Sequence, residues 1–201
     1  MIKTSLLPVV SLILLCGPGW AQRVQNSDIY FLAGPAVSGS MAIPGSNATV
    51  NKSTGVSVST GYGYQVARAS AASIWLDFAP TIAAGRITAA SIPGSVNFDF
   101  TSYTAGLRFM IPLQSRTSVF GALGGGWGTF WYPVISGGPN PSVSSNQTTH
   151  GVFQFGGGVD IRLTERISIR GEARDFVSGS GLSGSTGPHH VVPLMGVALH
   201  F

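Results

Sequence analysis

The residues from Gln22 onward alternate between large apolar side chains and small or polar ones, and they contain no run of about 18 apolar residues that could form a membrane-spanning helix. The alternation is clearest in residues 56–66, where even positions carry Val, Thr and Tyr and odd positions carry Gly, Ser and Gln. Successive side chains of a β-strand point to opposite faces. The pattern therefore predicts strands with one apolar and one small polar face, and it excludes a helical membrane protein.

The same alternation recurs along the chain and predicts eight strands. They cover residues 28–37, 54–66, 72–82, 103–111, 118–131, 150–163, 166–174 and 191–201. The facing of the first segment is left open by its sequence. Residues 96–101 have the opposite parity to the strand that follows them, which indicates either a bulge that exchanges the faces or a stretch that rises above a bilayer.

The connections between these strands alternate between long and short. The long ones are rich in Gly, Ser, Pro and Asn and cover residues 38–53, 84–95, 133–149 and 178–189. The short ones cover residues 67–71, 112–117 and 164–166. This order predicts an up-and-down antiparallel sheet with long loops on one rim and tight turns on the other, as in outer-membrane barrels. An even number of strands places both chain ends on the short-turn, periplasmic rim.

The side chains on each face decide between a soluble and a membrane barrel. A lipocalin-like soluble barrel is also eight-stranded, but it holds its apolar side chains inside. Here the charged residues share a face with Gly and Ser, and the other face carries Phe, Ile, Val, Leu and Trp. We therefore expect an all-β, eight-stranded antiparallel up-and-down transmembrane β-barrel, closed so that no strand edge is left unpaired in lipid.

Composition excludes two other classes. With 44% hydrophobic and 9% charged residues, the chain is too apolar for an ordinary disordered protein. The net charge of +4 comes from basic residues scattered singly among acidic ones, so nucleic acid is not expected as a partner.

The N-terminus has the features of an export signal. Lys3 precedes an apolar run over residues 6–15, and Gly19-Trp20-Ala21 provides small residues before a cleavage site. We expect residues 1–21 to be a cleaved signal peptide and residues 22–201 to form the barrel domain. A lipoprotein signal ending at Cys16 is less favoured, because Leu15 stands where such signals need a small residue. The mature chain then has no cysteine, and the bacterial outer membrane is the expected location.

Charged residues on the predicted inner face form the first candidate site. The interior of an eight-stranded barrel is just wide enough for side chains to fill it, so these groups are expected to pair across the lumen and close it. A narrow ion or small-solute pore remains an alternative, because many inward glycines leave space. The predicted lumen charge network comprises Asp77, Arg108, Asp160, Arg162, Arg170, Glu172 and Arg174.

Aromatic residues and histidines form two further groups of candidate residues. The rings of Tyr62, Tyr64, Trp127, Trp131 and Tyr132 are expected in interfacial girdles at the two membrane surfaces. Histidines lie near the ends of the last strands, but no carboxylate or cysteine accompanies them at ligand spacing, so no metal is expected. These histidines are His150, His189, His190 and His200.

Three stretches resemble the small bacterial outer-membrane β-barrel family that includes the OmpA-type transmembrane domain and the OmpX/Ail-like proteins. They are Gly156-Gly157-Gly158-Val159-Asp160-Ile161-Arg162, residues 167–175 and Gly196-x-x-Leu199-x-Phe201. The last resembles the signal that the barrel-assembly machinery reads, which implies roles for Gly196, Leu199 and Phe201. It departs from that signal at Leu194, where the family usually has a polar residue.

The resemblance implies outer-membrane lipid, lipopolysaccharide and the barrel-assembly machinery as partners of a monomer. Because the sequence ends with the last predicted strand, we do not expect the periplasmic peptidoglycan-binding domain that OmpA-type proteins carry. A structural or surface-binding role through four long extracellular loops is expected, with an unidentified surface ligand. Exchange of Phe201 for a polar residue is expected to impair assembly more than exchange of His200.

Catalysis has little support in the sequence. No Ser, His and acidic residue fall at a recognisable spacing, and the His-x-Ser element of barrels that deacylate lipid A is absent after His150 and His190. We expect no enzyme activity and no cofactor. A lipid A-modifying outer-membrane enzyme is the second alternative.

Overall fold

The computed structural model describes residues 25–36, 41–42, 49–89, 95–136, 142–178 and 189–201. Within these, side chains are not described for residues 41–42, 49–54, 86–89, 95–99, 132–136 and 142–146. The predicted signal peptide, residues 1–21, lies outside the described residues. No helix in the described part of the chain is long and apolar enough to cross a membrane.

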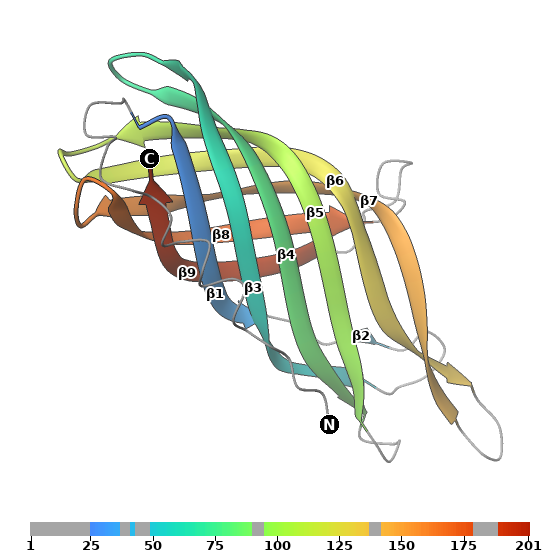
Figure 1. The fold of residues 1–201 in the computed structure, drawn as a ribbon. Helices are drawn as coiled ribbons and strands as arrows, with labels where there is room; N and C mark the ends of the chain where they lie inside the picture. Colours follow the sequence, from blue (N-terminus) through green and yellow to red (C-terminus); the bar gives the residue numbers. More distant parts are fainter. Residues whose placement is uncertain (1–24, 37–40, 43–48, 90–94, 137–141, 179–188) are drawn as a thin grey trace, which may run out of the picture.

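Eight long antiparallel strands and one very short strand make up the described sheet (Figure 1). They are β1 (Ser27–Ala36), β2 (Met41–Ala42), β3 (Thr49–Arg68), β4 (Ser73–Ala89), β5 (Ser95–Pro112), β6 (Thr117–Ser136), β7 (Ser142–Arg162), β8 (Ile167–Ser178) and β9 (His189–His200). Each long strand from β3 to β8 pairs with the next along the chain, and β1 pairs with both β9 and β3. The predicted eight-stranded up-and-down barrel is confirmed, and β2 is a two-residue addition to β3.

The first and last strands close the barrel. Ile29 lies opposite Leu199 of β9 on one side and opposite Tyr62 of β3 on the other. The backbone N–H of Ser27 donates to the Phe201 carbonyl at 3.1 Å, and the Phe201 N–H donates to the Ser27 carbonyl at 2.9 Å. These bonds lie on the rim that holds the short turns, where Figure 1 places the C-terminus.

The inner and outer faces follow the predicted alternation. On β3 the odd positions from Ser57 to Gly63 are buried, and the even positions Tyr62 and Tyr64 are exposed. The facing of β1, which the sequence left open, is now fixed because Asp28, Tyr30 and Leu32 are buried while Ile29 and Phe31 are exposed.

The parity change before the fourth predicted strand is not a bulge. β5 pairs with β4 from Ser95 to Met110 without a register shift. Phe100 lies on the inner face, and its ring centroid is 5.7 Å from that of Phe130 and 5.6 Å from that of Phe176. The apolar residue at position 100 therefore marks an apolar part of the lumen instead of an exchange of faces.

Three of the four predicted long loops are shorter than expected, because the strands continue into them. β3 begins at Thr49, β4 ends at Ala89, and β6 and β7 extend to Ser136 and Ser142. A strand can keep its backbone pairing beyond the stretch of apolar alternation, so the sequence pattern made these strands too short. The connection between β8 and β9 lies where it was predicted.

The lumen is filled by two layers along its length. Charged side chains occupy the half nearer the short turns, and an apolar cluster occupies the half nearer the long connections. The cluster comprises Tyr30, Leu32, Ala36, Ala79, Ala83, Phe100, Phe130, Val152, Phe176, Val192, Leu194 and Ala198. Buried hydroxyls lie among these apolar residues, at Ser57, Ser59, Thr81 and Ser102, so that half of the lumen is mixed, and the ionic part of the expected polar lumen lies in the half nearer the short turns.

Candidate functional site: the ion-pair network in the lumen

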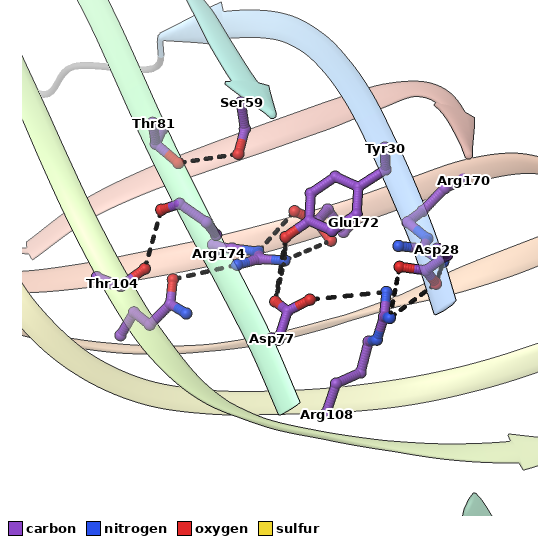
Figure 2. Close-up of polar contacts among 12 residues, drawn as sticks. Asp28, Tyr30, Ser59, Asp77, Thr81, Thr104, Arg108, Arg170, Glu172 and Arg174 are labelled. Atoms are coloured by element: carbon purple, nitrogen blue, oxygen red, sulfur yellow. Dashed lines mark hydrogen bonds and ion pairs between the residues drawn. The ribbon is translucent and has the colours of Figure 1, made fainter. Parts of the chain in front are cut away.

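Three arginines project from β5 and β8 into the lumen (Figure 2). Arg108 and Arg170 have no exposed side-chain surface, and Arg174 has 1%. All three occupy even positions, which face inward on their strands. A guanidinium group with no access to water needs carboxylate partners, since an unpaired buried charge costs several kcal/mol.

Asp28 joins two of these arginines across the barrel. Nη2 of Arg108 donates to Oδ1 and Oδ2 of Asp28 at 2.9 and 2.7 Å, and Nη2 of Arg170 donates to Oδ2 at 2.8 Å. Arg170 also donates from Nε and Nη2 to Oδ2 of Asp160, at 3.0 and 2.8 Å. The first strand is thereby tied to β5 and β8, and through Arg170 to β7.

Arg174 forms the second centre of the network, closer to the apolar half. Its Nε donates to Glu172 Oε1 at 2.6 Å, and its Nη2 donates to Asp77 Oδ2 and to the Tyr30 hydroxyl, both at 3.0 Å. The Tyr30 hydroxyl in turn donates to Asp77 Oδ2 at 3.1 Å. Gln154 accepts a longer bond of 3.3 Å from Arg174 Nη1.

Aromatic rings pack against the guanidinium groups of both centres. The Arg108 guanidinium carbon lies 5.1 Å from the Trp75 ring centroid, and that of Arg170 lies 4.9 Å from the Tyr30 centroid. Both distances are within the range of a cation–π interaction. Nη1 of Arg108 is 3.8 Å from Oδ1 of Asp77, so the two centres approach each other without a hydrogen bond between these atoms.

The structure brings most of the sequence-predicted lumen residues together, with one exception. Asp77, Arg108, Asp160, Arg170, Glu172 and Arg174 join the network. Arg162 does not: it is exposed at the end of β7 and forms none of the ion pairs found among the described residues. Its inward parity is correct, but the strand ends there and the side chain reaches water.

Sequence reasoning missed Asp28, Tyr30 and Gln154 as members of the network. The apolar Leu32 shares the inner face of β1 with Asp28, and this mixture obscured the alternation. The signal that could have identified Asp28 and Tyr30 is the outer face of β1, because Ile29, Phe31 and Ala33 recur with period two. Gln154 has the inward parity of β7 but carries no charge, so it was not included among the charged candidates.

Two inward glycines of β3 make room for the network. A Cβ atom at Gly61 would overlap the ring and hydroxyl of Tyr30, and one at Gly63 would overlap Arg108 Nη2 and Asp28 Oδ1. The inward glycines were the reason for the pore hypothesis. At these two glycines the space is occupied by other side chains.

Gly63→Val is expected to destabilise the barrel by about 1–3 kcal/mol, because the added side chain would displace the Arg108–Asp28 pair. Gly171→Ala is the control, since a Cβ atom there would meet nothing within 4 Å. Denaturant unfolding of both variants in lipid vesicles measures the difference. Equal stability of the two variants would show that the glycine space is not needed.

A Ser, a His and an Asp meet at the short-turn end of the lumen. Nε2 of His200 is 2.9 Å from the Ser168 hydroxyl and 4.0 Å from Asp160 Oδ1. In a catalytic triad the acid contacts the other ring nitrogen, Nδ1, and the serine is reachable by substrate. Ser168 has 0% exposure, so the geometry matches a structural link between β8 and β9. Because His200 is buried, it is also a poor comparison for Phe201 in assembly experiments.

Two histidines lie at the opposite end of the barrel. Nδ1 of His189 is 2.6 Å from Oδ2 of Asp175, a carboxylate partner that the sequence spacing did not reveal. The His190 ring stacks on Phe130 at 5.3 Å and contacts Phe100 at 5.4 Å. In the described part of the chain, no group of three or more His, Cys, Asp and Glu residues could hold a metal ion.

The predicted girdle residues, and Leu199 and Phe201 of the assembly segment, lie on the outer face where their side chains are described, whereas Gly196 is at an inward position of β9. Tyr62, Tyr64 and Trp127 are 42%, 45% and 58% exposed, and Trp131 is half-buried. The side chain of Tyr132 lies outside the described residues. In the assembly segment, Phe201 is exposed, Leu199 is half-buried, and Gly196 lies where a Cβ atom would overlap the Phe31 carbonyl of β1.

Comparisons with known proteins identify a shared fold but no protein of closely similar sequence. No protein-family model matches the chain, and no curated protein matches it. Among solved structures, Neisserial surface protein A is 15% identical over 87% of this chain and 96% of its own, with a TM-score of 0.50. Ail of Yersinia pestis is 14% identical over 88% of this chain and 99% of its own, with a TM-score of 0.46. At such low identity, the likeness to Neisserial surface protein A shows the barrel fold alone.

Proposed function

We propose that the chain is a monomeric bacterial outer-membrane barrel with a sealed lumen, and that it serves as a structural or surface-binding module. In this proposal residues 1–21 direct export, the barrel-assembly machinery inserts the barrel, and lipid and lipopolysaccharide surround it. The surface ligand would contact the connections at the rim opposite the short turns. The observation that carries the proposal is the pairing of an exposed apolar outer face with a buried ionic lumen.

The outer face supports a lipid environment. From Phe153 on β7 to Leu163, the first residue after the strand, every outward residue is Phe, Val, Ile, Leu or Gly. This stretch has about 11 residues, which is the length that a tilted strand needs to cross a bilayer. Beyond it, the exposed hydroxyls of Thr129 and Thr149 lie 3.1 Å apart on β6 and β7. Soluble monomers rarely expose an apolar surface this continuous.

The lumen supports a closed barrel. The buried ion pairs join β1, β4, β5, β7 and β8 across the interior, and the apolar cluster lies directly above them. The space beside the inward glycines Gly61 and Gly63 is filled by Tyr30, Arg108 and Asp28, which supports a lumen plugged by side chains. The same burial argues against an enzyme, because Ser168 lies out of reach of a lipid substrate.

Planar-bilayer recording tests the closed lumen. The purified, refolded barrel is expected to give no steady channel under conditions in which a general porin conducts. Gel heat-modifiability before the recording verifies that the sample is folded. Steady, reproducible openings would favour the narrow pore instead.

Phe201→Ser is expected to lower severalfold the amount of folded barrel in the outer membrane while leaving refolding in detergent unchanged. The Phe201 side chain is 43% exposed and faces outward, so its loss removes little internal packing. Val191→Ser is the matched control, because Val191 lies on the same face of the same strand with 48% exposure. Equal assembly of the two variants in cells would contradict a recognition role for Phe201.

A further inference from the structure

The outer face of β6 and β7 changes from apolar to hydroxyl-bearing side chains where these strands approach the long connections. On β7 the outward residue Phe153 is 46% exposed, and the next outward residues toward the long connection are Gly151 and Thr149. On β6 Thr129 follows Trp127 on the same face, and its hydroxyl oxygen lies 3.1 Å from that of Thr149. Side chains at the border of the apolar band lie at the depth of lipid headgroups.

The indole ring of Trp127 has an aromatic neighbour on one side and a glycine on the other. Trp127 is 58% exposed; its partner on β5 is Tyr103, and the two ring centroids are 6.0 Å apart. Its partner on β7 is Gly151, where a Cβ atom would meet nothing within 4 Å. The side of the indole that faces β7 therefore has open space beside it at the depth of the headgroups.

Polar groups beside this space keep part of their hydrogen-bonding capacity. Within the described part of the chain, the Trp127 N–H takes part in no hydrogen bond, whereas the N–H of the buried Trp75 donates to the Ser73 hydroxyl at 2.9 Å. Thr129 and Thr149 share one hydrogen bond, so one of the two hydroxyl protons and several oxygen lone pairs are left for an outside partner. The border thus offers both donors and acceptors.

An aromatic ring beside uncharged hydroxyls suits one kind of headgroup. The five residues are here called the Trp127 patch: Tyr103, Trp127, Thr129, Thr149 and Gly151. A sugar ring has a face of C–H groups, whose partial positive charge is attracted to the negative face of an aromatic ring. The hydroxyls at the rim of a sugar both donate and accept hydrogen bonds, as those of threonine do. A phosphate would instead favour charged partners, and none of the five residues is charged.

We propose that the Trp127 patch binds the sugar ring of a glycolipid headgroup in the leaflet beside the long connections. The sugar lies against the indole of Trp127 in the space beside Gly151, and its hydroxyls bond to the two threonines. This rests on the proposed function, because it requires that the outer face of the barrel contacts lipid.

Denaturant unfolding in vesicles of phosphatidylcholine, with and without a neutral diglucosyl diacylglycerol, tests the proposal. The glycolipid is expected to raise the folding equilibrium constant of the natural chain by roughly 3- to 10-fold, the effect of one good aromatic contact. Gly151→Val should lose this gain, because its side chain fills the space beside the indole. Gly171→Val is the matched control and should keep the gain. Gly171 faces outward on β8 opposite Val159, and a Cβ atom there also meets nothing within 4 Å.

A gain that persists in Gly151→Val, or that Gly171→Val loses equally, would refute the patch. If Gly151→Val does not fold, Trp127→Leu is compared with Tyr64→Leu. Tyr64 is also an outward aromatic residue, 45% exposed, but it lies toward the short turns. Only the Trp127 variant should lose the gain, and equal losses in the two variants would contradict the proposal.

Two further arms identify the ligand. Maltose dissolved around vesicles of phosphatidylcholine should not reproduce the gain; an equal gain would show that a free sugar is the ligand and overturn the lipid assignment. Phosphatidylglycerol has hydroxyls but no sugar ring, so it should give no gain that Gly151→Val removes, and such a gain would rule out recognition of the ring.

The same vesicles separate this proposal from the proposed function. A natural chain that folds in phosphatidylcholine but gains nothing from the glycolipid would refute the Trp127 patch alone. Failure of the natural chain to insert into phosphatidylcholine would instead count against a membrane barrel.

Discussion

Asp28→Asn is expected to destabilise the barrel by about 3–5 kcal/mol, because it removes the carboxylate that two buried guanidinium groups share. The amide keeps the shape of the side chain but cannot balance the charges of Arg108 and Arg170. Both arginines have 0% exposure, so water cannot replace the lost partner. The free energy of unfolding in vesicles, measured by denaturant titration, gives the loss directly.

Asp175→Asn provides the control for this substitution. Asp175 also accepts from a basic side chain, but its partner His189 is 54% exposed, so the loss should stay below about 1 kcal/mol. A cycle that combines Asp28→Asn with Arg170→Met isolates the coupling between the two groups. The loss of unfolding free energy in the double variant should be smaller than the sum of the losses in the two single variants. Additive losses would mean that the network does not act as a unit.

Val159→Arg is expected to destabilise the barrel by about 2–4 kcal/mol, the cost of a charged side chain near the middle of a bilayer. Val159 faces outward on β7 with 39% exposure, between Phe155 and Ile161 on the same face. Unfolding in vesicles measures the change in free energy.

Thr149→Arg is the matched variant for the lipid-facing test. Thr149 lies on the same outer face of β7, beyond the apolar stretch, so arginine there should cost no more than about 1 kcal/mol. Similar losses at Val159 and Thr149 would mean that the outer face of β7 does not meet lipid where its apolar residues lie.

The fold could be predicted because one property, period-two alternation, marks a strand that has lipid on one side and a packed interior on the other. The same property explains the errors. Residues beyond the apolar band, such as those at the start of β7 from Ser142, show no apolar alternation in the sequence and read as a loop although their backbone is paired. Alternation also assigns a face but not a depth, so it could not separate Arg162 at the rim from Arg170 in the interior.

The candidate site was harder to predict than the fold because its partners come from strands far apart in the sequence. Arg174 and Asp77 are 97 residues apart, and Arg170 and Asp28 are 142 apart. The inward parity of each strand identifies the residues that can join the ion-pair network. Which carboxylate pairs with which guanidinium group depends on barrel closure and on the tilt of the strands. Asp28 shows this most clearly, because its role follows from the pairing of β1 with both β3 and β9.

The proposed function depends most on which face of the sheet contacts lipid. The fluorescence of two tryptophans can identify that face. Trp127 faces outward with 58% exposure, and Trp75 faces inward with 3%. Two variants would each retain one of them, with the other tryptophans replaced by Phe, and be folded into vesicles whose acyl chains carry bromine, a contact quencher of indole fluorescence. Strong quenching of Trp127 and weak quenching of Trp75 is the predicted result. Equal quenching of the two, or stronger quenching of Trp75, would contradict a barrel with an apolar outer face in lipid and a sealed interior.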